Sequence, residues 1–270
     1  MKNKASEGNL KYNLLQLKNK VCIITGAASI RSIGYGTAEL FAAHGAKLVI
    51  LDVMMNELIA NDLTNHIETQ IGKSIEILCL PCDIRNITDC EIAIEKSLTH
   101  FHTIDCLVNC AGIVKSEGML SITEQDYDSI MNVNLKGTFN ICKSVLKVFT
   151  EKQSGVIVNL ASLAGQRGGG LVGGSHYAAS KGGVISLTRS IAREFAHMNI
   201  RANVICPAMI ETPMLDGLSA EQLDSVIAGI PLKRVGKTSE LAGACLFLAS
   251  DLSGFVTGAT IDVNGGIHIH

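Results

Sequence analysis

Residues 21–36 read Val21-Cys-Ile-Ile-Thr-Gly-Ala-Ala-Ser-Ile-Arg-Ser-Ile-Gly-Tyr-Gly36. The first five residues are apolar or β-branched and predict a short buried strand, and the glycine that follows them allows a tight turn. The residues after the last glycine predict a helix. The amino end of such a helix presents free backbone N–H groups and a positive partial charge, which suit a phosphate group. The stretch therefore predicts a strand, a phosphate-binding turn and a helix.

The rest of the chain repeats this alternation of strand and helix. Because the strands are continuous apolar runs separated by helices, we expect them to be parallel and covered on both faces. This predicts an α/β fold with a doubly wound, seven-stranded parallel sheet, the Rossmann fold. The strands are expected at residues 21–25, 47–51, 75–80, 106–109, 155–160, 201–206 and 260–263, and the helices at 35–44, 55–72, 87–101, 123–153, 177–197 and 239–250.

The domain organisation follows from the same pattern. We expect one domain over residues 17–270, because neither an internal repeat nor a Pro- or Ser-rich linker interrupts the alternation. Residues 1–16 are polar and predict a flexible extension. The least regular region, residues 208–237, follows a predicted strand end, where binding loops lie in such folds.

Composition excludes several classes of protein. Of 270 residues, 47 % are hydrophobic and 18 % are charged, which supports a large core and argues against disorder. The net charge of −2 favours neither nucleic acid nor an anionic membrane as a partner. The chain has no apolar run long enough to cross a bilayer, and its start lacks the apolar segment of a signal peptide. We therefore expect a cytoplasmic protein.

The cysteine and histidine patterns predict neither a redox centre nor a metal site. The nine cysteines are scattered and odd in number, which favours free thiols over a disulfide framework. Cys79 and Cys82 form a C-x-x-C pair, but they lie on an apolar run that predicts buried strand residues. His268 and His270 provide two ligands, too few for a metal site. We expect no metal in the catalytic site.

A carboxylate at the end of the second predicted strand indicates the cofactor. Asp52 follows Gly26 by twenty-six residues. At this position a carboxylate accepts hydrogen bonds from both ribose hydroxyls of an adenosine and repels a 2′-phosphate. Alternatively, Asp52 caps a surface turn. Because a carboxylate facing a phosphate is costly, Asp52 predicts NAD as the cofactor.

A tyrosine and a lysine stand four residues apart in Tyr177-Ala-Ala-Ser-Lys181 and therefore share one face of a predicted helix. A nearby ammonium group stabilises a phenolate and lowers the pKa of the tyrosine. A phenol adjusted in this way is suited to proton exchange with an alcohol or a carbonyl group. The spacing alone is weak evidence, because a surface pair of this kind contributes only about 0.3 kcal/mol and occurs by chance.

Over residues 17–266 the chain resembles the short-chain dehydrogenase/reductase family. The matching motifs are the first turn, Cys82-Asp83-Ile84, Asn109-Cys-Ala-Gly112, Pro207-Ala-Met-Ile-Glu-Thr212 and the closing segment 257–266. The first turn has two extra residues and Ser32 in place of the middle glycine, which is more similar to the enoyl-ACP reductases of the same superfamily. Arg31 precedes that glycine position, where members of the family that use NADP often have a basic residue, so the resemblance implies a counterargument for NADP. We give Asp52 more weight, because a carboxylate facing a phosphate is costly. The resemblance implies that the cofactor is bound by Gly26, Ser32, Ile33, Gly34, Asp52, Asp83, Ile84, Asn109, Ala111, Gly112, Tyr177, Lys181, Pro207, Ile210 and Thr212.

The resemblance also implies a catalytic set of Asn134, Ser162, Tyr177 and Lys181. Tyr177 exchanges the proton, and Lys181 lowers its pKa and binds the nicotinamide ribose. Ser162 steadies the developing oxyanion. Asn134 holds a water that relays the proton. No metal takes part in this mechanism.

The predicted function is hydride transfer between NAD(H) and a secondary alcohol or ketone, including 3-hydroxy or 3-oxo compounds. The alternatives are a 3-oxoacyl-ACP reductase, an enoyl reductase and a non-enzymatic NAD sensor or scaffold. Enoyl reductases separate the tyrosine from the lysine by more residues, so the spacing of Tyr177 and Lys181 favours carbonyl chemistry. Resemblance implies a homotetramer that pairs the helices at 123–153 and 177–197. The glycine-rich residues 165–174 suggest a flexible wall over a small-molecule substrate, and an apolar pocket is expected from Leu163, Val172, Met209, Met214 and Leu218.

Overall fold

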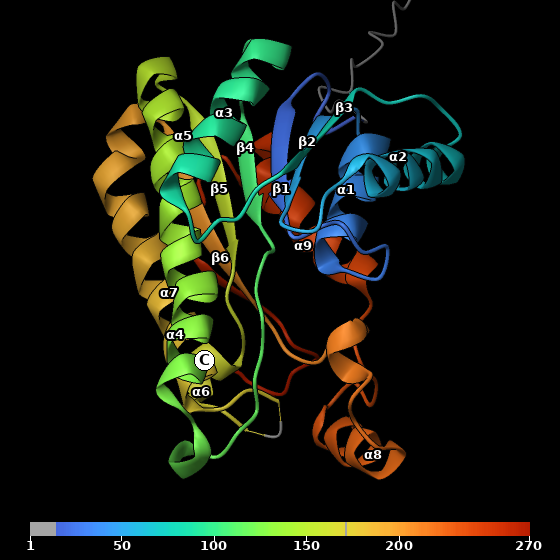
Figure 1. The fold of residues 1–270 in the computed structure, drawn as a ribbon, viewed down its shortest axis with the longest axis vertical. Helices are drawn as coiled ribbons and strands as arrows, with labels where there is room; N and C mark the ends of the chain where they lie inside the picture. Colours follow the sequence, from blue (N-terminus) through green and yellow to red (C-terminus); the bar gives the residue numbers. More distant parts are fainter. Residues whose placement is uncertain (1–14, 171) are drawn as a thin grey trace, which may run out of the picture.

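A computed structural model describes residues 15–170 and 172–270, and it contains the predicted sheet (Figure 1). All seven strands are parallel and lie in the order β3-β2-β1-β4-β5-β6-β7. The doubly wound α/β fold is therefore confirmed. The strands are β1 (Val21–Thr25), β2 (Lys47–Asp52), β3 (Ile77–Pro81), β4 (Cys106–Asn109), β5 (Gly155–Leu160), β6 (Ile200–Pro207) and β7 (Thr260–Val263).

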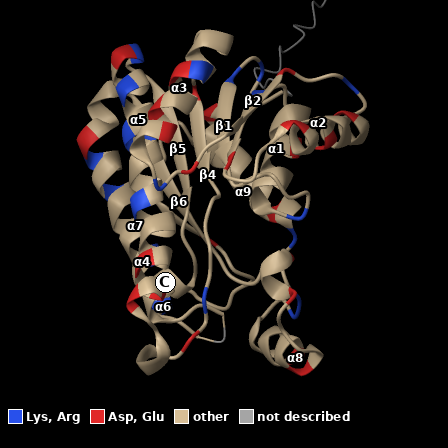
Figure 2. Ribbon diagram, in the orientation of Figure 1, with Lys and Arg blue, Asp and Glu red and all other residues tan. Residues whose placement is uncertain are grey.

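Helices cover both faces of the sheet and close two hydrophobic cores. Successive strand residues point to opposite faces, so Ile24 belongs to one core and Ile23 to the other. The charged side chains gather on the helices and loops, while the strands carry few of them (Figure 2). One face is covered by α1 (Ile33–Ala43), α2 (Glu57–Ile71) and α9 (Thr238–Ala249), the other by α3 (Ile87–Phe101), α4 (Glu124–Met131), α5 (Thr138–Lys152) and α7 (Ser175–Phe195).

The strand order places a crevice at the carboxyl ends of β1 and β4. These strands are neighbours in the sheet, but the chain leaves β1 toward β2 and leaves β4 toward β5 on the opposite side. Ligands of doubly wound sheets bind outside such a switch point. Gly26 follows β1 directly, and Ser162 lies two residues beyond β5. The fold therefore collects the predicted site residues at one edge of the sheet.

The predicted helix over residues 123–153 is confirmed over residues 124–152, with one wide turn inside it. A wide π-helical turn, Asn132–Gly137, separates α4 from α5. The amide of Asn134 bonds to both backbone groups of Ile113, with Nδ2 donating to the carbonyl and Oδ1 accepting from the N–H, at 2.9 Å in each case. These two hydrogen bonds connect the wide turn, which contains Asn134, to the loop after β4. Such π-helical turns are frequent at functional sites.

Smaller details of the secondary structure also differ from the prediction. The third strand spans Ile77–Pro81, and α7 begins at Ser175, two residues earlier than expected. Residues 208–237 are more regular than expected, because they contain a 3₁₀ turn (Pro213–Leu215) and α8 (Ala220–Gly229). A capping box between Ser219 and Gln222 starts α8. A further short helix, α6 (Ala164–Arg167), follows β5.

The start of the domain is packed against the sheet. Leu17 is buried, and its N–H donates to His44 O at 3.1 Å. The expectation of a flexible extension falls mostly on residues 1–14, which lie outside the described part of the chain. Within the described ranges, no helix has the length and apolar character needed to span a bilayer.

Candidate active site

Two glycines shape the turn after β1. Gly26 has φ +70°, and a Cβ there would lie 2.6 Å from the Cα of Ala111. A Cβ at Gly34 would lie 2.4 Å from Gly26 O. Both positions therefore exclude side chains, and the turn packs closely against the loop after β4. Ser32 caps α1 by accepting from the backbone N–H of Tyr35 at 3.0 Å, and its own hydroxyl hydrogen remains available as a donor.

A cleft of about 510 Å³ lies at the switch point. It brings together predicted cofactor residues that come from four separate strand ends and from the loop after β6. Those that line it are Gly26, Ser32, Ile33, Asp52, Asp83, Ile84, Ala111, Gly112 and Thr212. Gly34 and Asn109 lie behind this surface, whereas Pro207, Ile210, Tyr177 and Lys181 line an adjoining cavity.

Asp52 is held rigidly at the edge of the cleft. Its Oδ2 accepts from the N–H of Ala28 at 3.0 Å, and its Oδ1 accepts from the N–H of Met54 at 2.9 Å. The first bond ties the end of β2 to the glycine turn. Each carboxylate oxygen keeps lone pairs for further donors. The geometry fits a carboxylate that is oriented in advance toward vicinal hydroxyl groups.

Arg31 is paired with a residue far away in the sequence. Its Nη1 and Nη2 donate to the two carboxylate oxygens of Asp216 at 2.9 and 2.6 Å. Asp216 follows the 3₁₀ turn after β6, so this pair joins the glycine turn to the region before α8. Sequence reasoning missed the pair because its partners are 185 residues apart. The guanidinium group that favoured NADP is thus already matched by a carboxylate.

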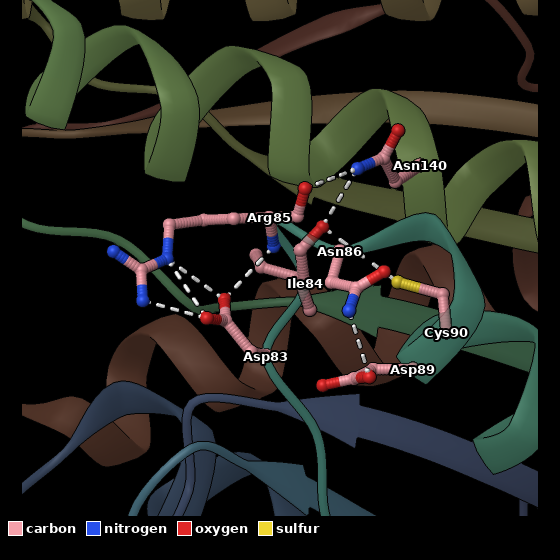
Figure 3. A network of polar contacts seen from close by, with 7 residues as sticks. All are labelled: Asp83, Ile84, Arg85, Asn86, Asp89, Cys90 and Asn140. Carbon is pink, nitrogen blue, oxygen red and sulfur yellow. Dashed lines mark hydrogen bonds and ion pairs between the residues drawn. The ribbon is translucent and has the colours of Figure 1, made fainter.

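Asp83 is likewise engaged by an arginine (Figure 3). Arg85 donates to it from Nε, Nη2 and the backbone N–H, at 2.6–3.0 Å. The guanidinium group holds the pKa of Asp83 below its ordinary value. Asn140 of α5 donates to the carbonyl groups of Ile84 and Arg85, so the loop that carries Asp83 is fixed from two sides.

Asn109 belongs to a buried chain of hydrogen bonds across the strand ends. Its Oδ1 accepts from Thr25 at 2.8 Å, and its Nδ2 donates to Asn159 Oδ1 at 3.3 Å. Thr25 Oγ1 in turn accepts from the N–H of Ala111 at 3.1 Å. Asn159 continues the chain by donating to Thr188 on α7. The network positions the loop under the cleft, while Asn109 itself does not line it.

A second cavity of about 320 Å³ adjoins the cleft and is lined by three of the four predicted catalytic residues, Ser162, Tyr177 and Lys181. Its wall is largely apolar, and Arg167 and Lys181 are its charged members among the described residues. The predicted pocket residues Leu163, Val172, Met209 and Met214 line it. The prediction for Leu218 is wrong: this residue lies beyond the 3₁₀ turn, and Leu215 of that turn lines the cavity instead.

Tyr177 is buried in the first turns of α7 and faces the cavity. Burial raises the pKa of its phenol, and a hydrogen bond with Ser162 opposes this shift. Because burial has the larger effect, the pKa of this phenol lies above its ordinary value in the protein without nucleotide. The phenol is therefore neutral at pH 7 and able to donate a proton.

Lys181 lies one helical turn after Tyr177 and is equally buried. Its Nζ donates to Leu160 O at 2.9 Å and lies 5.9 Å from the centre of the Tyr177 ring. Burial lowers the pKa of this lysine to about 8. The ammonium group therefore remains mostly charged at neutral pH, in a place where charge is costly.

Asn134 lies behind the catalytic pair. Its Nδ2 donates to Ser180 Oγ at 3.1 Å in addition to its bonds with Ile113. A Cβ built at Gly112 would lie 3.2 Å from Asn134 Oδ1 and 3.3 Å from Lys181 Nζ. Both polar atoms thus border the same small space, and Oδ1 keeps one lone pair facing it.

The glycine-rich loop carries two close contacts that the sequence did not reveal. Gly173 has φ +93°, and a Cβ there would lie 2.3 Å from Cδ1 of Tyr177. A Cβ at Gly165 would lie 2.7 Å from the backbone of Lys181. These glycines allow the loop and α6 to pack directly onto the catalytic helix. Leu171 of this loop lies outside the described residues.

Substituting Gly173→Ala should lower kcat/KM at least tenfold. The added methyl group cannot fit beside Tyr177 without moving its ring, and the backbone angle strains any residue with a Cβ, at a cost of about 1–3 kcal/mol. Steady-state kinetics and thermal denaturation measure both effects. Gly243→Ala in α9 is the matched control, since nothing lies within 4 Å of its added carbon. Unchanged kinetics in Gly173→Ala would show that the loop does not position the ring.

Comparison with known proteins agrees with this arrangement. Residues 26–268 match the family profile described as "Enoyl-(Acyl carrier protein) reductase". A protein of Sinorhizobium fredii named an uncharacterized short-chain type dehydrogenase/reductase is 42 % identical over 94 % of this chain and 99 % of that protein. The 3-oxoacyl-[acyl-carrier-protein] reductase of Thermotoga maritima is 40 % identical over 94 % of this chain and 100 % of its own length.

A solved structure supports the same relationship. Levodione reductase superposes with a TM-score of 0.86 at 31 % sequence identity, covering 93 % of this chain and 98 % of that one. The chain therefore belongs to the short-chain dehydrogenase/reductase family and is an oxidoreductase of that family.

Proposed function

We propose that the protein interconverts a secondary alcohol and a ketone, with NAD(H) as the second substrate. The observation that carries this proposal is the position of Tyr177, Lys181 and Ser162 in one largely apolar cavity that adjoins the cleft with Asp52. A bound nicotinamide supplies or accepts the hydride. The glycine turn, Asp52 and the loop after β4 would hold the nucleotide, and the close approach at Gly26 fits a cradle for phosphates.

The residues of the chain supply the proton and stabilise the oxygen. In reduction, the neutral Tyr177 phenol donates its proton to the carbonyl oxygen as that oxygen becomes an alcohol. Ser162 donates a hydrogen bond to the same oxygen, and the Lys181 ammonium stabilises the phenolate that remains. Oxidation reverses these steps, so Tyr177 then accepts the alcohol proton. Burial strengthens each of these interactions.

Asn134 serves as a positioning residue for the return of the proton. Its amide fixes the loop after β4 and Ser180 of α7. The free lone pair of its Oδ1 borders the same space as Lys181 Nζ, which suits a water shared by the two groups. We propose that this water passes protons between Lys181 and solvent.

The choice of NAD rests on the charges around the adenosine end of the cleft. Asp52 presents a carboxylate that two backbone N–H groups hold in place. The nearby arginines, Arg31 and Arg85, are matched by Asp216 and Asp83. A 2′-phosphate would therefore meet a fixed negative charge and would have to displace an existing ion pair to gain a positive one.

Substituting Asp52→Ala should shift the ratio of kcat/KM for NADP to kcat/KM for NAD upward by at least tenfold. The change removes the carboxylate that repels a 2′-phosphate, which favours NADP. It also removes the acceptor for the ribose hydroxyls, which disfavours NAD. Asp216→Ala is the informative partner variant, because it frees Arg31 while leaving Asp52 in place. An unchanged ratio in Asp52→Ala would refute the assignment of NAD.

A second candidate is reduction of a 3-oxoacyl thioester. It is favoured by the names of relatives, which include the 3-oxoacyl-[acyl-carrier-protein] reductase of Escherichia coli at 34 % identity over 94 % of this chain. Rates with a 3-oxoacyl thioester and with a panel of simple ketones, each tested with NADH and NADPH, separate the two. Fast NADPH-dependent reduction of the thioester, with slow ketone reduction, would favour the second candidate.

We further propose a cytoplasmic homotetramer that pairs α4, α5 and α7 with their symmetry mates. Half-exposed aromatic side chains on two of these helices, Tyr127 and Phe139, are consistent with such contacts. Light scattering coupled to size-exclusion chromatography measures the assembly. A monomer mass at micromolar concentration would contradict the proposal.

A further inference from the structure

Three metal-binding side chains meet outside the catalytic cavity. Asp262 lies on β7, and His268 and His270 follow it in the closing segment. One ligand atom from each residue lies within 4.8 Å of the other two. The sequence offered only two histidines here, and the fold adds the carboxylate. We propose that these residues bind one divalent first-row transition metal ion, with zinc as the reference ion.

The polar contacts around His270 Nε2 conflict with one another. Its Nε2 lies 3.0 Å from Asp262 Oδ2 and 3.0 Å from Gln166 Nε2. If Nε2 carries a proton for Asp262, it meets the amide donor of Gln166. If Nε2 is unprotonated, it meets the carboxylate as a second acceptor. Exchanging the positions of the nitrogen and oxygen of the Gln166 amide would let the oxygen accept from His270 Nε2. That exchange would, however, place the amide oxygen 3.0 Å from Asp262 Oδ1, and both of these atoms are acceptors.

A second unsatisfied atom lies beside this contact. The Oε1 atom of Gln166 is buried without a hydrogen-bond partner. Buried polar atoms are rarely left in this state, because the loss costs about 1–3 kcal/mol each. A metal ion shared by His270 Nε2 and Asp262 Oδ2 removes the need for a proton between these two acceptors, and Gln166 Nε2 keeps its hydrogen bond to Asp262 Oδ1.

The surroundings of the three ligands match a metal site. Gln166 Nε2 donates to Asp262 Oδ1 at 3.0 Å, which is the hydrogen bond that commonly orients a carboxylate ligand. Asn264 Nδ2 donates to His268 O at 3.0 Å and fixes the turn that brings the imidazoles to β7. The two imidazole rings lie edge to face, 4.7 Å apart. Ligands of tetrahedral zinc lie roughly 3.3 Å from each other, so spacings of up to 4.8 Å would shorten by at most about 1.5 Å when the ion binds.

Imidazole and carboxylate ligands select the class of ion. Two nitrogens and one oxygen suit zinc, nickel, copper or cobalt better than magnesium or calcium, which prefer sets of oxygens. Three protein ligands leave a fourth position for water. His270 is the exposed member, so the ion can enter from solvent.

The proposed ion would fix one wall of the substrate cavity. Ile267, between the ligands Asp262 and His268, lines that cavity, and its carbonyl accepts from Arg167 Nη1 at 3.0 Å. Gln166 and Arg167 belong to α6, which also lines the cavity. The ion would therefore tie the closing segment to β7 and α6. Its role is structural, and it takes no part in hydride transfer.

Zinc titration of the full chain without a polyhistidine tag, after removal of metals by a chelator, tests the proposal. We expect one equivalent to bind to the wild type, raise its melting temperature and slow amide hydrogen exchange in residues 264–270. His268→Ala and Asp262→Asn should each weaken binding at least tenfold, and Gln166→Leu should weaken it by about tenfold through the lost hydrogen bond. His197→Ala, an exposed histidine on another surface, is the matched control and should bind as the wild type does.

Cobalt distinguishes this site from the nine cysteines. Binding at Asp262, His268 and His270 gives weak ligand-field absorption without the intense charge-transfer bands of thiolate ligands. Equal zinc uptake by the wild type and by a variant combining Asp262→Asn with His268→Ala would overturn the proposal. A thiolate-type cobalt spectrum in the wild type would overturn it as well. The melting curves of the variants in excess chelator should match the wild type, which separates lost binding from lost folding.

Discussion

Tyr177→Phe should lower kcat by at least about a thousandfold, within the range that loss of a general acid or base produces. The substitution removes one oxygen, and with it the proton that the carbonyl oxygen needs during reduction and the base that alcohol oxidation needs. The ring stays, so the packing against Gly173 is retained. Nucleotide binding should change by less than threefold.

Two measurements check this prediction. Initial rates of nicotinamide reduction give kcat, and a fluorescence titration with NADH gives the affinity for the nucleotide. Tyr127→Phe, at a half-exposed position on α4, is the control and should keep wild-type rates. Rates near wild type in Tyr177→Phe would rule out the proton-transfer role.

Lys181→Met should abolish turnover and, at the same time, stabilise the protein without nucleotide by about 1–2 kcal/mol. Burial lowers the pKa of Lys181 from 10.5 to about 8, so the folded state pays to hold a charge at neutral pH. A pKa shift of this size corresponds to a destabilisation of the folded state by roughly 3 kcal/mol, which Lys181→Met removes. The substitution also removes the hydrogen bond to Leu160 O, which stabilises the folded state by about 1 kcal/mol. Lys136→Met, at an exposed position, is the control.

The same lysine predicts a pH dependence of stability. Its pKa in the folded state lies below that in the unfolded state, so the unfolded state binds more protons between about pH 8 and 10.5. From this group, the free energy of unfolding rises with pH across that window and is constant below it. Urea denaturation of the wild type and of Lys181→Met at several pH values measures the difference. A difference that does not change with pH would contradict the depressed pKa of Lys181.

The sheet could be predicted from the sequence because its strands are continuous apolar runs that alternate with helices. Six of the seven predicted strands agree with the structure to within one residue at each end. The third strand begins at Ile77, two residues later than predicted. The prediction included Ile75 because it is apolar, but this residue precedes those that pair with β2. The wide turn at Asn132–Gly137 could not be predicted, since it depends on the contact of Asn134 with Ile113, twenty-one residues away.

The proposed catalytic residues could be named from the sequence because their spacing and flanking motifs are local. The pair of Arg31 with Asp216 could not, because it forms only when the fold brings two distant loops together. The same holds for Asp262 beside the two histidines. The close packing of Gly173 on Tyr177 could not be predicted either. A run of glycines in the sequence does not distinguish a mobile loop from a closely packed one.

The central claim is direct hydride transfer at the Tyr177 site, and isotope transfer tests it most directly. Wild-type protein and Tyr177→Phe are incubated with NAD and with secondary alcohols or 3-hydroxyacyl thioesters that carry deuterium at the alcohol carbon. Mass spectrometry then reads the label in the reduced nucleotide. We predict one deuterium per reduced nucleotide with the wild type and none above background with Tyr177→Phe. Equal labelling by both proteins, or tight NAD binding with no labelled nucleotide from any substrate, would contradict the claim.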